Sequence, residues 1–87
     1  MAKHYNITLT KTAQKQLDKL TDNIANPILS AIATLSTNPR PQGYKKLKGR
    51  DAYRIRQGDY RIIYDIYDSV LIIDVITIAH RKDVYDL

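Results

Sequence analysis

The sequence predicts an α+β fold in which a pair of helices packs on one face of a curved, mainly antiparallel four-stranded sheet. Two observations support this prediction. After one short alternating segment, the first half repeats its apolar residues at helical spacing, and the second half alternates with a period of two between turn-forming pairs. With 87 residues, the chain is too short for two hydrophobic cores, so we expect one domain over residues 1–87 in the order β-α-α-β-β-β.

The first strand and helix are predicted from residues 4–21. His4–Leu9 alternates apolar and polar residues, which is typical of a half-buried strand. Thr10 is a suitable N-cap, and behind it apolar residues recur at helical spacing with Lys and Gln between them. We therefore expect an amphipathic helix over Lys11–Thr21.

A second helical stripe extends from Ile24 to Leu35. This helix requires Pro27 to lie in its first turn, where a missing N–H does no harm, and Asp22 or Asn23 could cap it. Two prolines and a glycine in residues 38–43 end the helix. The tight connection between the two helices predicts an antiparallel helical hairpin.

The second half is predicted to form a three-stranded meander. Its strands are Tyr53–Gln57, Tyr60–Tyr67 and Val70–Ala79. The dipeptides Gly58-Asp59 and Asp68-Ser69 supply the turns. Together with the first strand, this gives the four strands of the predicted sheet.

The composition indicates the kind of partner and the cellular compartment to expect. The chain has no cysteine, which suits the reducing cytoplasm, and it has no run of about 18 apolar residues, so we expect no membrane span. Its net charge is +5, and the segment from Arg40 to Arg61 holds eight cations but only two anions. A cationic middle predicts a polyanionic partner, either a nucleic acid or an acidic protein segment.

Three arginines are predicted to share one face of the sheet. If Gly58-Asp59 is a two-residue hairpin loop, Arg56 lies directly opposite Arg61, and the alternation of the strand adds Arg54 to the same face. Opposed like charges destabilise a sheet, and an anion such as phosphate is the simplest reason to gather them. The alternative is that an acid such as Asp65 or Asp74 neutralises them.

The C-terminal segment adds His80, Arg81 and Tyr85 to the candidate residues. A two-residue turn at Asp68-Ser69 would place His80 on the arginine face. The alternatives are that His80 is a surface residue and Tyr85 a packing residue. The two histidines lie far apart in sequence and the carboxylates do not cluster at ligand spacing, so we expect neither a metal nor a cofactor.

Three segments of the chain together carry a family resemblance. They are Lys45–Gly49, Tyr53–Tyr64 and His80–Tyr85, and they resemble the RelE branch of the RelE/ParE toxins along the whole chain. The resemblance implies a type II toxin that acts as a ribosome-dependent endoribonuclease, an mRNA interferase that cleaves messenger RNA in the ribosomal A site. It also implies a RelB-like antitoxin as partner, with operator DNA bound only through the antitoxin complex.

Five positions match active-site residues of the family by motif. The resemblance therefore implies that the active site includes Arg54, Arg56, Arg61, Arg81 and Tyr85. Many relatives carry lysine in place of Arg54 and Arg56. Because arginine cannot accept a proton in proteins, Tyr85 or His80 would carry more of the acid–base work. The basic loop would contact the backbone of ribosomal RNA through Lys45, Lys46, Lys48 and Arg50. The alternative is that this loop is merely solvated.

These residues suggest a metal-independent cleavage mechanism. The three arginines would hold the scissile phosphate, Tyr85 would take the 2′-OH proton, and His80 would protonate the leaving oxygen, or Arg81 would stabilise it. The products would be a 2′,3′-cyclic phosphate and a 5′-OH. Two rival hypotheses are a ParE-type toxin, which inhibits DNA gyrase by protein binding, and an inactive relative that binds only its antitoxin and operator DNA.

Overall fold

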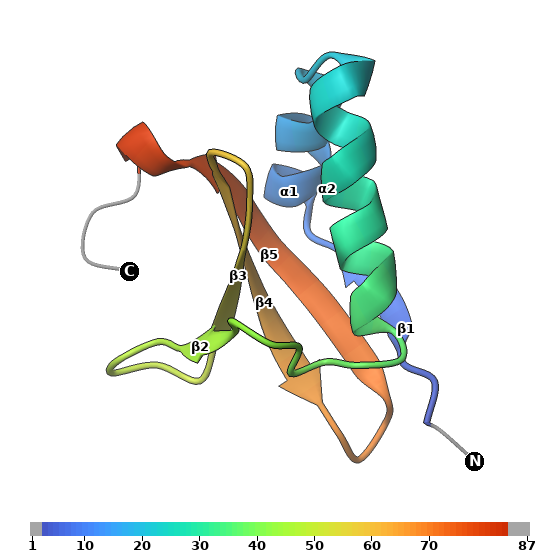
Figure 1. Ribbon diagram of the computed structural model, residues 1–87. Coiled ribbons are helices and arrows are strands. Elements are labelled where there is room, and N and C mark those ends of the chain that lie inside the picture. The colour runs from blue at the N-terminus through green and yellow to red at the C-terminus, as the bar shows by residue number, and fades with distance from the viewer. Residues whose placement is uncertain (1–2, 84–87) are drawn as a thin grey trace.

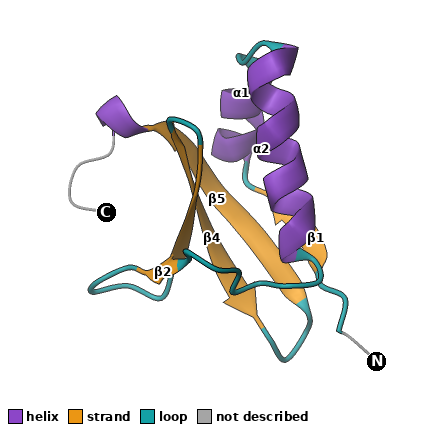
Figure 2. Cartoon of the chain, viewed as in Figure 1, coloured by secondary structure: helices purple, strands orange, loops and turns teal. Residues whose placement is uncertain are grey.

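The computed structural model describes residues 3–83 of the chain. Its helices and strands are shown in Figures 1 and 2. Their order is β1 (Asn6–Leu9), α1 (Lys11–Asp18), α2 (Asp22–Leu35), β2 (Lys45–Lys46), β3 (Tyr53–Gln57), β4 (Tyr60–Tyr67), β5 (Ile72–His80) and a final 3₁₀ turn (Arg81–Asp83).

The strands form one mixed sheet in the order β1-β5-β4-β3-β2. Strand β1 runs parallel to β5, and the other neighbours are antiparallel. Both helices lie on the same side of this sheet, as predicted (Figure 1). The sheet has five strands instead of four, because Lys45 and Lys46 pair with Arg54 and Tyr53. A two-residue strand is too short to show any periodicity in the sequence.

The helix caps agree with the prediction only for α1. The side chain of Thr10 accepts a hydrogen bond from the backbone N–H of Ala13 at 3.1 Å, which confirms it as the N-cap. Helix α2 begins earlier than expected, with Thr21 as N-cap, so capping by Asp22 or Asn23 was wrong. Pro27 consequently lies in the second turn, where it leaves one helical hydrogen bond unformed. Within residues 3–83, no helix is long and apolar enough to span a membrane.

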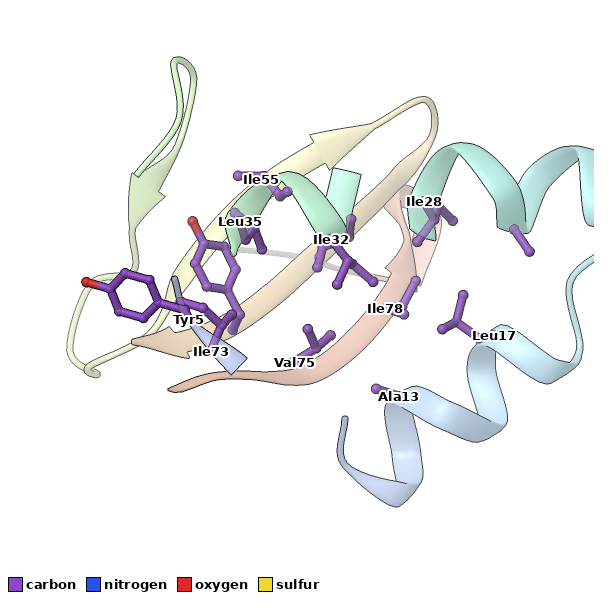
Figure 3. Packing of buried hydrophobic residues seen from close by; sticks show 13 residues of the cluster. Tyr5, Ala13, Leu17, Ile28, Ile32, Leu35, Ile55, Ile73, Val75 and Ile78 are labelled. Carbon is purple, nitrogen blue, oxygen red and sulfur yellow. The ribbon is translucent and has the colours of Figure 1, made fainter. Parts of the chain in front are cut away.

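The main core fills the space between the helix pair and the sheet (Figure 3). Its side chains come from Tyr5, from the inner faces of α1 and α2, and from alternate positions of β3, β4 and β5. Tyr64 and Ile62 of β4 are fully buried at its centre. The hydroxyl group of Tyr64 donates to the carbonyl oxygen of Pro39 at 2.7 Å, which fastens the segment after α2 to the sheet.

The two hairpins of the meander have different connections. Gly58-Asp59 is a two-residue turn with Gly58 at a φ of 60°, and Arg56 pairs with Arg61, as predicted. The second turn spans residues 68–71 instead of two residues, because Tyr67 pairs with Ile72 and Leu71 adopts a φ of 55°. Further along β5 the register shifts by one residue, and Ile76 is the extra residue of a β-bulge.

Candidate functional site

Arg54, Arg56 and Arg61 come together on the sheet face opposite the helices. Arg56 and Arg61 are direct cross-strand partners, and Arg54 lies two residues along β3 on the same face. Arg54 is only 5% exposed, whereas Arg56 is exposed. Burial, followed by repulsion from the charges of Arg56 and Arg61, lowers the pKa of the Arg54 guanidinium. The three positive charges therefore act on one another, as the predicted cluster requires.

A small pocket beside this cluster brings in Arg81. It has a volume of about 130 Å³ and is lined by side chains of the β3–β4 hairpin and by Arg81. The backbone N–H of Arg81 donates to the carbonyl oxygen of Asp59 at 2.7 Å, and its Nε lies 3.6 Å from the Asp59 carboxylate. Asp59 thus holds Arg81 next to Arg56 and Arg61. The sequence suggested Asp59 only as a turn residue.

The arginine face also carries a small apolar cluster. Leu47, Ala52 and Ile63 are buried there, with Ile76 packed against them. Ile63 is the cross-strand partner of Arg54, and it follows the alternation of Arg61 along β4. The face therefore carries a small apolar cluster beside the three arginines. Apolar neighbours explain how the Arg54 side chain is buried.

His80 does not share the arginine face, which corrects the prediction. It pairs with Tyr60, whose ring its imidazole meets edge-on at a centroid distance of 5.2 Å, and both line a pocket with residues of α2. The physical reason is the β-bulge in β5. The four-residue turn moves the pairing by two residues and so leaves each side chain on its expected face, whereas the extra residue Ile76 moves the pairing by one and turns His80 to the other face.

The acids proposed as neutralising partners lie further along the sheet. Asp65 and Asp74 are cross-strand partners on the arginine face. Asp65 accepts a hydrogen bond from the Tyr67 hydroxyl at 3.3 Å, and Asp74 accepts one from the Thr8 hydroxyl at 2.8 Å. This face therefore carries cations at one end and carboxylates at the other.

The predicted basic loop is the exposed β2–β3 hairpin, which carries Lys45, Lys46, Lys48 and Arg50. Its two strand residues point to opposite faces, because Lys45 pairs with Arg54 and Lys46 with Tyr53. Lys46 also lies 3.6 Å from the carboxylate of Asp51. The remaining candidate, Tyr85, lies outside the described residues.

This arrangement can bind a phosphate. Guanidinium groups match phosphate oxygens in a planar, bidentate geometry and keep their charge at physiological pH. Arg56, Arg61 and Arg81 line one pocket, and the charge of Arg54 lies directly beside it. The low exposure of Arg54 strengthens the attraction of its charge for an anion.

Comparisons with known proteins identify the family of the chain. The family described as the ParE toxin of type II toxin–antitoxin systems matches residues 7–85. The chain belongs to the RelE/ParE toxins. Toxin RelE of Mycobacterium tuberculosis is 32% identical over 84 residues, which cover 93% of this chain and 86% of that protein. Toxin RelG of the same organism is also 32% identical, covering 93% and 95%.

A solved structure gives the same fold. A chain of the archaeal RelE–RelB complex from Pyrococcus horikoshii superposes with a TM-score of 0.82 at 28% identity, covering 93% of this chain and 99% of that chain. The protein is thus a RelE-like toxin of a type II toxin–antitoxin system.

Proposed function

We propose that this toxin is a cytoplasmic, ribosome-dependent endoribonuclease that cuts messenger RNA in the A site and so inhibits translation. The observation that carries the proposal is the gathering of Arg56, Arg61 and Arg81 at one pocket, with the buried charge of Arg54 beside it. Four cations at one place suit a phosphodiester whose negative charge grows during cleavage. The names of the RelE and RelG relatives support the toxin role on which this proposal builds.

The proposed mechanism is attack by the 2′-oxygen on the adjacent phosphorus, with no metal required. Arg56 and Arg61 hold the non-bridging oxygens, while the charge of Arg54 stabilises the pentacoordinate transition state. Arg81, held in place by Asp59, stabilises the charge near the leaving oxygen. The products are a 2′,3′-cyclic phosphate and a 5′-OH.

In this proposal Tyr85 takes the proton of the 2′-OH, because cations such as those of the arginine cluster would favour the ionised form of a phenol brought up to them. His80 has no part in the reaction, since it lies on the helix side of the sheet against Tyr60. The basic β2–β3 hairpin contacts the RNA backbone of the ribosome, chiefly through Lys46, Lys48 and Arg50.

A RelB-like antitoxin is the proposed partner that neutralises the toxin. The solved archaeal RelE–RelB complex supports this pairing. An acidic or amphipathic antitoxin segment would gain charge pairing over the arginine cluster. Operator DNA would be bound only through the toxin–antitoxin complex.

The ParE description of the family favours a second candidate, inhibition of DNA gyrase by protein binding without RNA cleavage. A protein-binding toxin has no evident need for three arginines at one pocket with a fourth beside it. The two candidates therefore differ in whether Arg81 and Tyr85 are required for toxicity.

One experiment separates these candidates. The toxin is induced in growing cells, and the ends of messenger RNA are mapped. The ribonuclease predicts cuts in phase with codons on translated messages, which disappear in Arg81→Ala and Tyr85→Phe. Lys15→Ala removes an exposed cation of α1 and serves as the charge control. Intact messages together with stalled gyrase in the wild type would instead support the ParE-like activity, and they would refute cleavage.

A further inference from the structure

We propose that Lys45 is the proton donor to the leaving 5′-oxygen, an inference that rests on the proposed ribonuclease function. Lys45 belongs to the two-residue strand β2, and its cross-strand partner is Arg54. Directly opposed residues of antiparallel strands project from the same face. Lys45 is therefore an exposed cation on the arginine face, at the edge of the cluster.

The spacing of the sheet places the cluster within reach of Lys45. Neighbouring strands lie about 5 Å apart, and two residues along a strand span about 7 Å. Arg56 is one strand across from Lys45 and two residues further along β3. The four-carbon stem of lysine covers such a separation, and its ammonium group is mobile. An anion held by Arg56 and Arg61 thus lies within range of the Lys45 Nζ.

Neither the arginines of the cluster nor His80 can serve as the proton donor to the leaving 5′-oxygen. Guanidinium groups do not release a proton in proteins, so the arginines can stabilise the leaving oxygen but cannot protonate it. His80 is directed to the other side of the sheet, and its Nδ1 accepts a hydrogen bond from the Lys82 N–H at 3.2 Å. A lysine ammonium carries protons that it can donate.

The proposed step is balanced. The 2′-oxygen forms a bond to phosphorus as its proton passes to the base. The bond from phosphorus to the 5′-oxygen breaks, with its electron pair staying on that oxygen. The 5′-oxygen then takes a proton from the Lys45 Nζ, which is left neutral and is reprotonated by water.

Lys46 offers a matched comparison one residue away. It carries the same charge on the same strand, but it pairs with Tyr53 and projects from the other face, where it lies 3.6 Å from the Asp51 carboxylate. A general effect of positive charge on RNA binding would involve both lysines. Proton donation to the leaving oxygen would involve Lys45 alone.

The test uses ribosomes programmed with a synthetic messenger RNA that has either oxygen or sulfur as the 5′-bridging atom at the A-site cleavage position. Sulfur is a good leaving group that departs without a proton. We expect Lys45→Ala to slow cleavage of the oxygen substrate about 100-fold, yet to cut the sulfur substrate within about threefold of the wild-type rate. Lys45→Arg should fail in the same way, since it keeps the charge but not the transferable proton. Lys46→Ala should change both rates by the same factor.

Other outcomes overturn the proposal. Equal losses of Lys45→Ala on both substrates would assign the residue to RNA binding, and an unchanged rate on oxygen would assign it no role. A wild-type toxin that cleaves neither message would refute the ribonuclease function itself, which distinguishes that failure from a failure at Lys45. Because the residue is exposed, circular dichroism should show the same fold for each variant.

Discussion

Arg56 and Arg61 face each other directly across the β3–β4 hairpin, so two side chains of the same charge share one face of the sheet. We predict that Arg56→Gln raises the free energy of unfolding by about 0.5 kcal/mol at low ionic strength, because it removes this repulsion. The gain should shrink in high salt, which screens the exposed charge. Chemical denaturation at two salt concentrations measures both effects. Arg50→Gln, in the exposed loop, should show no comparable gain, and an equal gain there would mean that net charge alone is responsible.

Arg81 and His80 are adjacent in sequence but lie on opposite sides of the sheet. Arg81→Ala should lower the cleavage rate on ribosomes by about 100-fold or more, as expected for the loss of a charge that stabilises a transition state. His80→Ala should leave the rate within about threefold. Single-turnover cleavage of one message by both variants provides the comparison. A large loss in His80→Ala would contradict the placement of the active site on the arginine face.

The hydrogen bond from Tyr64 to the carbonyl oxygen of Pro39 predicts a stability effect at a distance from the site. Tyr64→Phe should lower the free energy of unfolding by about 1 kcal/mol, because the part-buried carbonyl oxygen of Pro39 loses its donor. Thermal denaturation at neutral pH measures this loss. Tyr67→Phe is the control, because Tyr67 is exposed and its hydroxyl donates to the nearby Asp65 carboxylate.

Tyr64 also predicts an alkaline dependence of stability. Burial raises the pKa of its phenol above the ordinary value of 10.0. A group whose folded-state pKa is raised stabilises the fold below its unfolded pKa, and this contribution falls as the pH rises from about 10 toward the folded value. The wild type should therefore lose stability above about pH 10 more steeply than Tyr64→Phe. Parallel slopes for the two proteins would exclude Tyr64 as the titrating group.

The contacts of Asp68 predict the acid limit of stability. Hydrogen bonds from Arg40 at 3.0 Å and from the Tyr5 hydroxyl at 2.6 Å lower the pKa of its carboxyl below the ordinary value of 3.8. A lowered pKa stabilises the fold above the unfolded value, and this contribution is lost as the pH falls through the folded value. Asp68→Asn should therefore show a shallower decline in stability below about pH 4. If the stability of Asp68→Asn fell as steeply with decreasing pH as that of the wild type, Asp68 would not be the titrating group.

The first hairpin was predictable from the sequence to the level of individual residue pairs. Gly58 accepts the positive φ that the turn requires, and a two-residue turn fixes the register of both flanking strands. This is why the pairing of Arg56 with Arg61, and hence the arginine cluster, could be derived without coordinates.

The second hairpin was not predictable in the same way. Leu71 occupies a positive φ, although leucine gives no local signal for it, and the bulge at Ile76 depends on packing within the sheet. The bulge alone decides the side on which His80 lies, because it shifts the pairing by one residue, whereas the longer turn shifts it by two. Strand β2 was missed because two residues show no alternation. The pairing of Lys45 with Arg54 was missed for the same reason.

The Asp65–Asp74 pair sets a boundary for any polyanion on this surface. An extended RNA strand that followed β4 away from Arg61 would bring its phosphates onto these two carboxylates, and like charges would push it off the sheet. The surface therefore favours a short anionic stretch over a long one. Messenger RNA that is presented one codon at a time meets this requirement better than a long free RNA strand.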